Sequence, residues 1–169
     1  MLQALRILSV VLVAVGMGLA LAHALELPGK LRLDKAAYNS VQTIYYPGFT
    51  IGGFFGELGA MLATAALLIA TPFASPAFWP TLVALVGLLI MHGVFWAMTQ
   101  PVNRFWLRDQ KLHGAGAAFF AVGARHDSGQ SADHAWATYR NQWEYSHVAR
   151  AVLAMLSLIS LVWAVAGPA

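Results

Sequence analysis

The sequence is strongly apolar. Of its 169 residues, 59% are hydrophobic and 10% charged, and the mean hydropathy is +0.64. This composition is typical of membrane proteins. The sequence contains no cysteine, which excludes disulfides and thiolate ligands. A net charge of +3, without a basic run interleaved with aromatic residues, argues against a nucleic-acid partner.

Four apolar segments are close to the roughly 20 residues that a transmembrane helix requires. They cover residues 5–27, 49–70, 78–99 and 148–165. The sequence therefore predicts an all-α, integral membrane four-helix bundle that forms a single domain over residues 1–169.

Two polar segments, residues 28–47 and 101–146, connect the spans on one side of the membrane and contain nearly all the lysine and arginine. The opposite side has only Arg6. By the positive-inside rule, both polar segments are cytoplasmic, and both termini lie on the other side of what is expected to be a bacterial inner membrane.

A competing interpretation treats Met1–Ala24 as a cleaved signal peptide, because Arg6 precedes an apolar run that ends in Ala22-His23-Ala24. Cleavage would leave the basic residues from Lys30 to Lys35 outside, against the charge rule. The first segment is therefore interpreted as a span.

The two polar segments have structure of their own. Residues 28–46 contain a short amphipathic stretch, which suits either a segment on an anionic leaflet or a solvated loop. In the second segment, Gly114-Ala-Gly and Ser128-Gly-Gln indicate breaks. From about Ser131, residues spaced by three and four predict a helix that continues into the fourth span.

Glu57 is the only formal charge in the second span. An ionisable side chain inside a membrane usually faces the protein interior and has a partner. At about 1.5 Å of rise per residue, Glu57 lies roughly 15 Å from the cytoplasmic end of its span and His92 roughly 12 Å from that of the third. The sequence predicts that these two side chains meet.

Other polar residues lie on the same half of the predicted bundle. His23 and Glu26 belong to the first span, Trp96 and Asn103 to the third, and Trp143, His147 and Arg150 to the fourth. Their spacing places each set on one helical face. We therefore expect a polar zone inside the cytoplasmic half of the bundle.

Three chemistries fit such a zone. A transition metal (iron, copper or zinc) is one, with the candidate ligands His23, Glu26, Glu57, His92 and His147. General acid/base catalysis is the second, with the candidate catalytic residues Glu57, His92 and His147. Haem is the third, held by two of His23, His92 and His147.

A purely structural interpretation stays open beside these three. Glu57 then forms an ion pair with Arg150 that fixes helix packing, and His92 binds a backbone carbonyl. Pro101 is expected to end the third helix, and Asn103 to bind the carbonyls that this frees.

Several blocks resemble the anthrone-oxygenase-like proteins, a family of small four-helix membrane proteins. Gln100-Pro-Val-Asn103 is similar to a Pro-x-Asn motif at the end of that family's third span. Trp143-Glu-Tyr-Ser-His147-Val-Ala-Arg150 resembles a Trp-x-x-x-Asn/His-x-x-Arg motif before its last span, and Ala22–Pro28 a His-x-x-Glu-x-Pro motif. With its matching helix count and loop order, the resemblance covers most of the chain.

Some members of that family oxidise anthrones to anthraquinones without a conventional cofactor. The resemblance therefore implies an oxygenase or related oxidoreductase that acts on an anthrone- or quinone-like molecule. It also implies that Asn103, Trp143, His147 and Arg150 belong to a shared site or scaffold. Many members have asparagine at position 147, so the histidine here leaves the identity of the chemistry open.

Taken together, the residues and the resemblance predict a membrane oxygenase. Glu57, His92 and His147 are its candidate catalytic groups, and Trp96, Asn103, Trp143 and Arg150 its candidate substrate-binding residues. The expected partners are the lipid bilayer and a hydrophobic small molecule. The alternatives are a non-enzymatic metal- or haem-binding subunit of a larger membrane complex and a structural accessory protein; assembly into a homo-oligomer is left open.

Overall fold

The computed structural model describes residues 2–45, 48–106 and 132–167, and within these ranges all regular structure is helical. In chain order the elements are α1 (Leu2–Lys30), α2 (Lys35–Tyr45), α3 (Gly48–Gly53), the π-helical turn η1 (Phe54–Leu58), α4 (Gly59–Ala70), α5 (Phe78–Val94), the π-helical turn η2 (Phe95–Thr99), α6 (Gln100–Trp106) and α8 (Ala132–Ala166). The predicted all-α class is confirmed.

Four helical runs are long and apolar enough to cross a membrane. They are Leu2–Lys30, Gly48–Ala70, Phe78–Asn103 and Trp136–Ala166. The second run joins α3, η1 and α4, and the third joins α5, η2 and the start of α6. By length and composition the chain is an integral membrane protein, and each predicted span lies within one of these runs.

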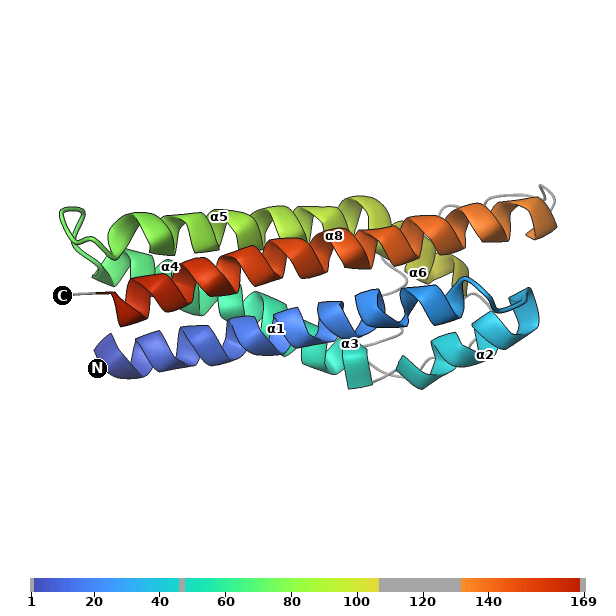
Figure 1. Cartoon of the computed structure of the whole chain (residues 1–169), viewed down its shortest axis with the longest axis horizontal. Helices are drawn as coiled ribbons and strands as arrows, with labels where there is room; N and C mark the ends of the chain where they lie inside the picture. Colours follow the sequence, from blue (N-terminus) through green and yellow to red (C-terminus); the bar gives the residue numbers. More distant parts are fainter. Residues whose placement is uncertain (1, 46–47, 107–131, 168–169) are drawn as a thin grey trace.

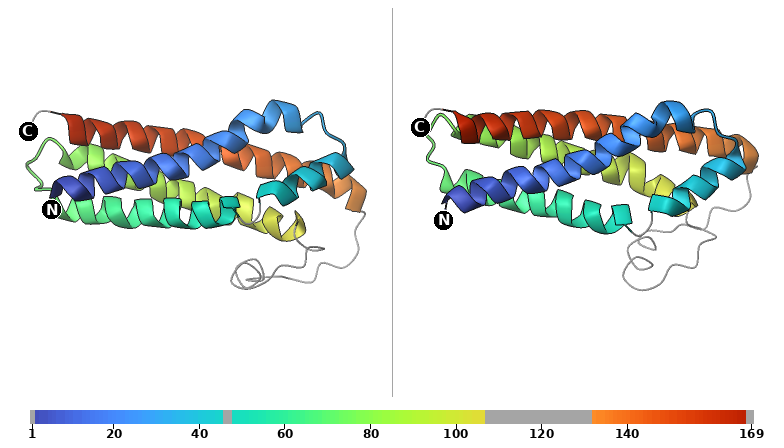
Figure 2. Two further views of the ribbon diagram at one scale, coloured as in Figure 1. Left: turned by 90° about the horizontal axis from the view of Figure 1, so that it is seen from below. Right: turned by 60° about the horizontal axis from the view of Figure 1, so that its bottom comes forward.

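The four runs form an antiparallel bundle (Figures 1 and 2). Its first and third runs each pack against the second run and α8, so that α1 contacts α4 and α8, and α5 contacts the same two helices. Both ends of the chain lie at one end of the bundle, whereas α2 and α6 lie at the other (Figure 1). We call these the terminal end and the polar end.

The core contains mainly aliphatic side chains from all four runs, including Val13, Leu67, Leu88 and Leu161. The outer surface is equally apolar: Ile69 is 87% exposed and Trp163 71% exposed. An apolar exterior of this kind is stable only in contact with lipid tails. The bundle therefore has an apolar inside and an apolar outside.

The helices extend further at the polar end than the sequence predicts. The first helix continues through Pro28 to Lys30 instead of ending at Leu27. The third run continues through Pro101 to Trp106, so the expectation that Pro101 ends it is wrong. Pro101 directly follows the π turn η2, where the Gln100 N–H bonds to the Phe95 carbonyl and the backbone hydrogen-bond spacing changes, so a residue without an N–H is accommodated inside the continuous run.

The amphipathic segment before the second span is the helix α2. Its start is capped by Asp34, whose carboxylate accepts a hydrogen bond from the Ala37 N–H at 2.8 Å. Tyr38 is fully buried against the bundle, while Ile44 is 74% exposed. The segment thus packs on the protein through its tyrosine face, and is not a solvated loop.

The last helix begins at Ala132, which confirms the helix predicted from about Ser131 into the fourth span. It therefore starts well before position 148 and occupies much of the segment predicted as a loop. The two predicted breaks, Gly114-Ala-Gly and Ser128-Gly-Gln, lie outside the described residues.

Candidate functional site

Each of the two middle runs has a π-helical turn beside a candidate residue. Glu57 lies within η1, and His92 lies in the last turn of α5, just before η2. Glycines surround η1, at positions 52, 53, 56 and 59, and lower the α-helical propensity there. Single π turns inside α-helices occur frequently at functional sites.

Glu57 connects two other helices. The Arg150 guanidinium of α8 donates a hydrogen bond to Glu57 Oε1, and Glu57 Oε2 lies 3.6 Å from His92 Nδ1. The Glu57 side chain is 14% exposed and that of Arg150 7%. The structure thus brings Glu57 and His92 together, and Arg150 pairs with Glu57 and not with Glu26.

The orientation of His92 follows from its neighbours. The Trp96 indole N–H donates to His92 Nε2 at 2.9 Å, so this nitrogen is an acceptor and is unprotonated. In the neutral ring the proton is then on Nδ1, which faces the Glu57 carboxylate. His92 is therefore neutral: its Nε2 is free of a proton and can act as a base, and its Nδ1 faces the carboxylate.

This group, which we call the Glu57 site, lies at the lipid-facing surface. The His92 side chain is 35% exposed, and Trp96 is 43% exposed. On the inner side, the Arg150 guanidinium lies over the Phe95 ring, 5.2 Å from its centroid. A molecule dissolved in the lipid can approach His92 without crossing the bundle.

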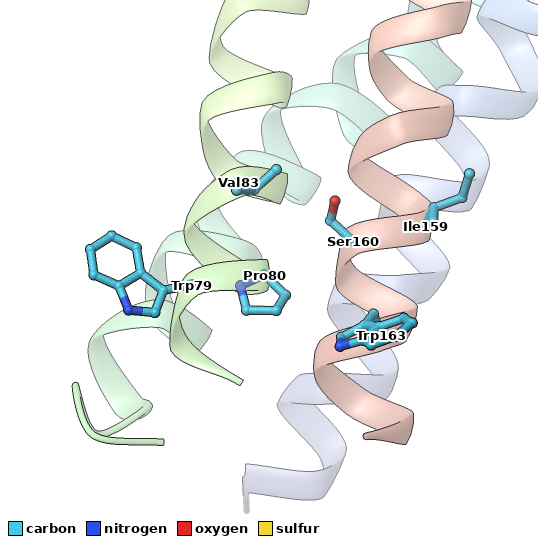
Figure 3. A pocket seen from close by; sticks show the side chains of 6 residues that line it. All are labelled: Trp79, Pro80, Val83, Ile159, Ser160 and Trp163. Carbon is cyan, nitrogen blue, oxygen red and sulfur yellow. The ribbon is translucent and has the colours of Figure 1, made fainter. Parts of the chain in front are cut away.

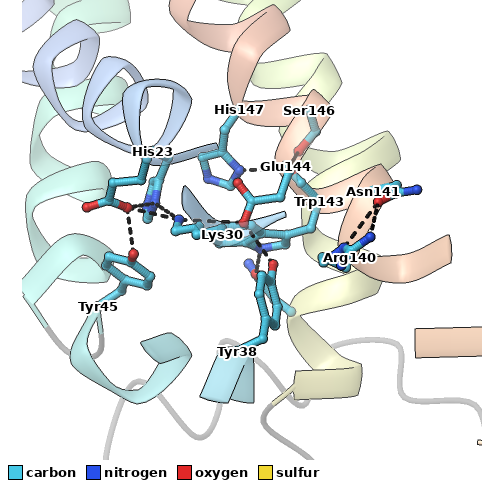
Figure 4. Close-up of polar contacts among 12 residues, drawn as sticks. His23, Lys30, Tyr38, Tyr45, Arg140, Asn141, Trp143, Glu144, Ser146 and His147 are labelled. Atoms are coloured by element: carbon cyan, nitrogen blue, oxygen red, sulfur yellow. Dashed lines mark hydrogen bonds and ion pairs between the residues drawn. The ribbon is translucent and has the colours of Figure 1, made fainter. Parts of the chain in front are cut away.

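The other candidates form a second group at the polar end, which we call the His23 cluster (Figure 4). His23 is buried, and its ring centroid lies within 5 Å of four other rings. These are Tyr45, Phe49, Trp143 and His147. Helices α1, α2, α3 and α8 thus meet around one imidazole.

Charged groups surround this aromatic centre. The Lys30 ammonium lies 2.9 Å from Glu26, 3.3 Å from His23 Nδ1 and 3.6 Å from Glu144. It also lies over the rings of Tyr45 and Trp143, at 4.5 and 5.0 Å from their centroids. A buried ammonium with carboxylate and aromatic neighbours is well compensated.

Two tyrosines of α2 complete the cluster. Tyr38 donates a hydrogen bond to Glu144 at 2.9 Å, and Tyr45 donates to Glu26 at 2.5 Å. Burial, followed by the neighbouring Glu144 carboxylate, raises the pKa of the Tyr38 hydroxyl well above its ordinary value. Burial and the hydrogen bond to Glu26 raise the pKa of Tyr45 in the same direction.

Asn103 and Trp143 join α6 to α8. The Trp143 indole N–H donates to Asn103 Oδ1 at 2.7 Å, and Asn103 in turn donates to Gln100 at 3.4 Å. The carbonyl of Met98 accepts instead from Gln142, at 3.0 Å. Asn103 therefore holds the tryptophan and does not bind the carbonyls near Pro101, the role that the sequence suggests for it.

Sequence reasoning missed three residues of the cluster: Lys30, Tyr38 and Glu144. All three are nearly or fully buried. Lys30 falls in residues 28–47, the polar segment predicted to follow the first span. A signal for both charged residues is nonetheless present, because Lys30 continues the stripe of His23 and Glu26, and Glu144 lies three residues before His147 on the same face of α8.

The predicted metal ligands do not come together. Across residues 2–45, 48–106 and 132–167, no group of three or more histidine, aspartate and glutamate side chains is placed to hold a metal ion. Glu57 and His92 lie in one group, and His23, Glu26 and His147 in the other. The rings of His23 and His147 contact each other, with centroids 4.4 Å apart, and leave no space for a haem plane between them.

A shallow apolar groove lies at the terminal end, far from both groups (Figure 3). It runs between α5 and α8, and its lining residues are Trp79, Pro80, Val83, Ile159, Ser160 and Trp163. With one hydroxyl as its only polar side chain apart from the indole N–H groups, it offers no acid, base or ligand set.

Comparisons with protein-family models, with curated proteins and with solved structures give no match to this chain. The likeness to the anthrone-oxygenase-like family thus depends on the short motifs, the helix count and the loop order, and stays a prediction.

Proposed function

We propose that this protein is a membrane-embedded oxygenase-type oxidoreductase that acts on an apolar aromatic molecule of the anthrone or quinone type. The observation that carries the proposal is the orientation of His92. Its Nε2 accepts a hydrogen bond at the lipid-facing surface, while its Nδ1 faces Glu57, 3.6 Å away. At this distance the two atoms form a close polar contact and not a hydrogen bond; when substrate binding shortens it, the pair becomes the carboxylate-oriented imidazole that acts as a base in many enzymes.

The first step is a proton transfer. A substrate with an acidic hydroxyl, or an acidic C–H beside a carbonyl, takes the place of the Trp96 indole and gives its proton to His92 Nε2. The imidazolium that forms faces the Glu57 carboxylate, which Arg150 holds in place. Low dielectric strengthens this charge compensation.

The substrate anion is then oxidised by dioxygen. For an anthrone the ring CH₂ becomes C=O, a four-electron oxidation that one O₂ molecule accepts. One oxygen atom enters the product, and the other leaves as water together with both hydrogens. The proton on His92 returns to the departing oxygen, so the base is regenerated without an external reductant.

The polar end lies on the cytoplasmic side in this proposal, because the positive-inside rule favours that orientation. Trp143, Asn103 and His147 form the frame next to the site and correspond to the motifs of the resembling family. His147 is placed one helical turn from Arg150. The exposed Trp96 supplies aromatic surface for the substrate beside His92.

The test is oxidation of an anthrone by the protein purified in detergent, measured as quinone formation and oxygen uptake. We expect His92→Gln to lower the rate by about 10²–10⁴-fold, the usual effect of losing a general base. Trp163→Phe, at the terminal end, is the control substitution and should leave the rate unchanged. Helical circular dichroism verifies that every variant is folded.

Two results would contradict the proposal. One is wild-type oxidation no faster than the uncatalysed reaction; the other is a rate that His92→Gln leaves unchanged. Elemental analysis and an optical spectrum of the same preparation separate the alternatives. Stoichiometric metal or haem that is lost in Glu57→Gln would favour the metal-binding subunit, and an inactive, cofactor-free protein would favour the packing role.

A further inference from the structure

The reaction proposed above uses the Glu57 site and assigns no role to the His23 cluster. That cluster is nevertheless rich in titratable groups that lie inside an apolar bundle. Ionisable residues are costly at membrane depth and commonly mark the pathways of ions and protons. Their contacts define an ordered series that begins at the aqueous surface.

The outer end of the series is Glu26. Its side chain is 42% exposed, while those of its partners His23 and Lys30 are 6% and 4% exposed. Lys30 contacts Glu26 at 2.9 Å and donates to His23 Nδ1 at 3.3 Å. A proton taken up by the carboxylate thus has a hydrogen-bonded route to a buried imidazole.

The series continues from α1 to α8. The rings of His23 and His147 are in contact, with centroids 4.4 Å apart. His147 Nδ1 donates to the Trp143 carbonyl at 2.9 Å, because a carbonyl can only accept. Nε2 of the neutral His147 ring is therefore unprotonated and able to take up a proton.

One turn of α8 separates His147 from Arg150, so their Cβ atoms are about 5–6 Å apart. The Arg150 guanidinium binds Glu57, whose second oxygen faces His92. His147 has no direct hydrogen bond to Glu57, and Arg150 stays protonated, so the path requires a rotation of the Glu57 carboxylate or one bridging water molecule at this last step. The groups that face the series from other helices are Tyr45 of α2, through Glu26, and Glu144 of α8, through Lys30.

We propose that Glu26, Lys30, His23 and His147 form a proton path that connects the aqueous surface at the polar end to the Glu57–His92 pair. The path sets the protonation state of His92 regardless of which substrate binds next to this histidine. The inference therefore does not depend on the oxidation chemistry. It gives the second cluster a function: proton exchange for a base that faces lipid.

The structure also supplies a reporter of this exchange. The Trp96 indole donates to His92 Nε2 only while that nitrogen is unprotonated, so protonation of His92 breaks the bond and changes the emission of Trp96. The difference between the protein and its Trp96→Phe variant isolates this signal from the other tryptophans. A rapid pH jump, with the protein in phosphatidylcholine nanodiscs, then gives the rate of proton exchange at His92.

We expect His23→Gln and Glu26→Gln to slow this response by about tenfold, which corresponds to roughly 1.4 kcal/mol of added barrier. Tyr45→Phe is the matched control, since it removes the hydrogen bond to Glu26 and leaves every member of the path. Acetic acid, whose neutral form crosses lipid, should restore the rate in the two slowed variants. His147→Gln supplies a third interruption if either of the others fails to fold.

An unchanged rate in folded His23→Gln and Glu26→Gln would overturn the path, because protons would then reach His92 by another route. A wild-type Trp96 signal that does not respond to pH would overturn it as well. Slowing by Tyr45→Phe to the same extent would show that loss of α2 docking, and not loss of a proton carrier, is the cause, and would also refute the path.

Discussion

Arg150 and Glu57 form an ion pair between two membrane-spanning runs. Arg150 is 6% exposed, and its guanidinium is bound to the carboxylate of another span. Removing one partner of such a pair leaves an uncompensated buried charge, whereas replacing both with uncharged groups of similar volume is often tolerated. Substitution of one partner is therefore expected to lower the free energy of unfolding more than substitution of both.

We expect Glu57→Gln to lower the free energy of unfolding by about 3–5 kcal/mol, because Arg150 then has no counter-charge. The double variant Glu57→Gln/Arg150→Met should recover most of that loss. Reversible unfolding in mixed micelles, carried out as a double-mutant cycle, measures the coupling. Additive effects of the two substitutions would show that the pair contributes no net stability.

Tyr38 gives a pH dependence with a definite sign. Its pKa is raised in the folded protein, first by burial and then by Glu144, so the folded state favours the neutral phenol. The resulting stability is fully present below the ordinary tyrosine pKa of about 10 and is lost as the pH rises above that value.

We therefore expect an absorbance titration to show tyrosinate forming at higher pH in the folded protein than in the denatured chain. In Tyr38→Phe this late step should become smaller, and the alkaline loss of stability weaker. A Tyr38→Phe protein that loses stability above about pH 10 as steeply as the wild type would contradict the assignment.

Sequence reasoning worked for Glu57 because a lone charge in a long apolar run must have a partner, and depth along the helix suggested His92. It missed Lys30 and Glu144 because a charge near a span end costs little when hydrated, so a shared helical stripe alone does not require these side chains to be buried. Helix α2 covers them: the Tyr45 ring faces the Lys30 ammonium, and Tyr38 donates a hydrogen bond to Glu144. That contact joins residues 106 apart and has no local signal.

At the scale of the elements, α1 and η1 approach each other closely, backbone against backbone. A Cβ atom at Gly56 would lie 3.0 Å from the Gly16 nitrogen and 3.2 Å from its Cα, and backbone atoms cannot move aside cheaply. At Gly53, three residues earlier, a Cβ would meet nothing within 4 Å. Small residues at such crossings let membrane helices pack closely.

We expect Gly56→Ala to destabilise the protein by about 1–3 kcal/mol, the usual cost of overpacking. Gly53→Ala should be neutral or stabilise it by up to about 1 kcal/mol, because alanine favours the helix. Thermal unfolding of the two variants in the same detergent makes the comparison. Equal effects of the two substitutions would show that α1 and η1 do not cross at Gly56.

The presence of the four membrane helices can be predicted from the lengths of the apolar segments, because the thickness of the bilayer sets that length. The residues at which the helices end cannot be predicted in this way. Pro28 and Pro101 look like breaks in the sequence, yet both lie within helical runs. The π turn η2, which immediately precedes Pro101, explains the second case. The glycines around η1 weaken the α-helix there but do not specify a π turn, and η2 itself contains no glycine, so the positions of both turns come from the structure.

For the whole molecule, the arrangement of the runs fixes which connections share a side of the membrane. The turn at residues 71–77 lies at the terminal end, and the turn at residues 31–34 at the polar end (Figure 1). The positive-inside rule predicts that the polar end is cytoplasmic. Because the chain has no cysteine, single cysteines can report this directly.

We expect a membrane-impermeant thiol reagent to label Ala74→Cys in intact cells and Arg32→Cys only after the membrane is opened, since both positions are exposed in the structure. Labelling of Arg32→Cys alone in intact cells would invert the proposed orientation. Labelling of both would contradict the four-span topology.

The two π turns affect how this architecture can change during evolution. Each contains one residue more than the α-helix around it needs, so the helical faces before and after it differ in phase by about 100°. The orientation of the helical face in the apolar half of each span is therefore independent of the orientation in the polar half. Mutations can change which face one half presents to its neighbours without rotating the other half. Loss of a single codon within η1 or η2 would realign the two phases, leaving a membrane bundle that still folds and no longer directs Glu57 toward His92.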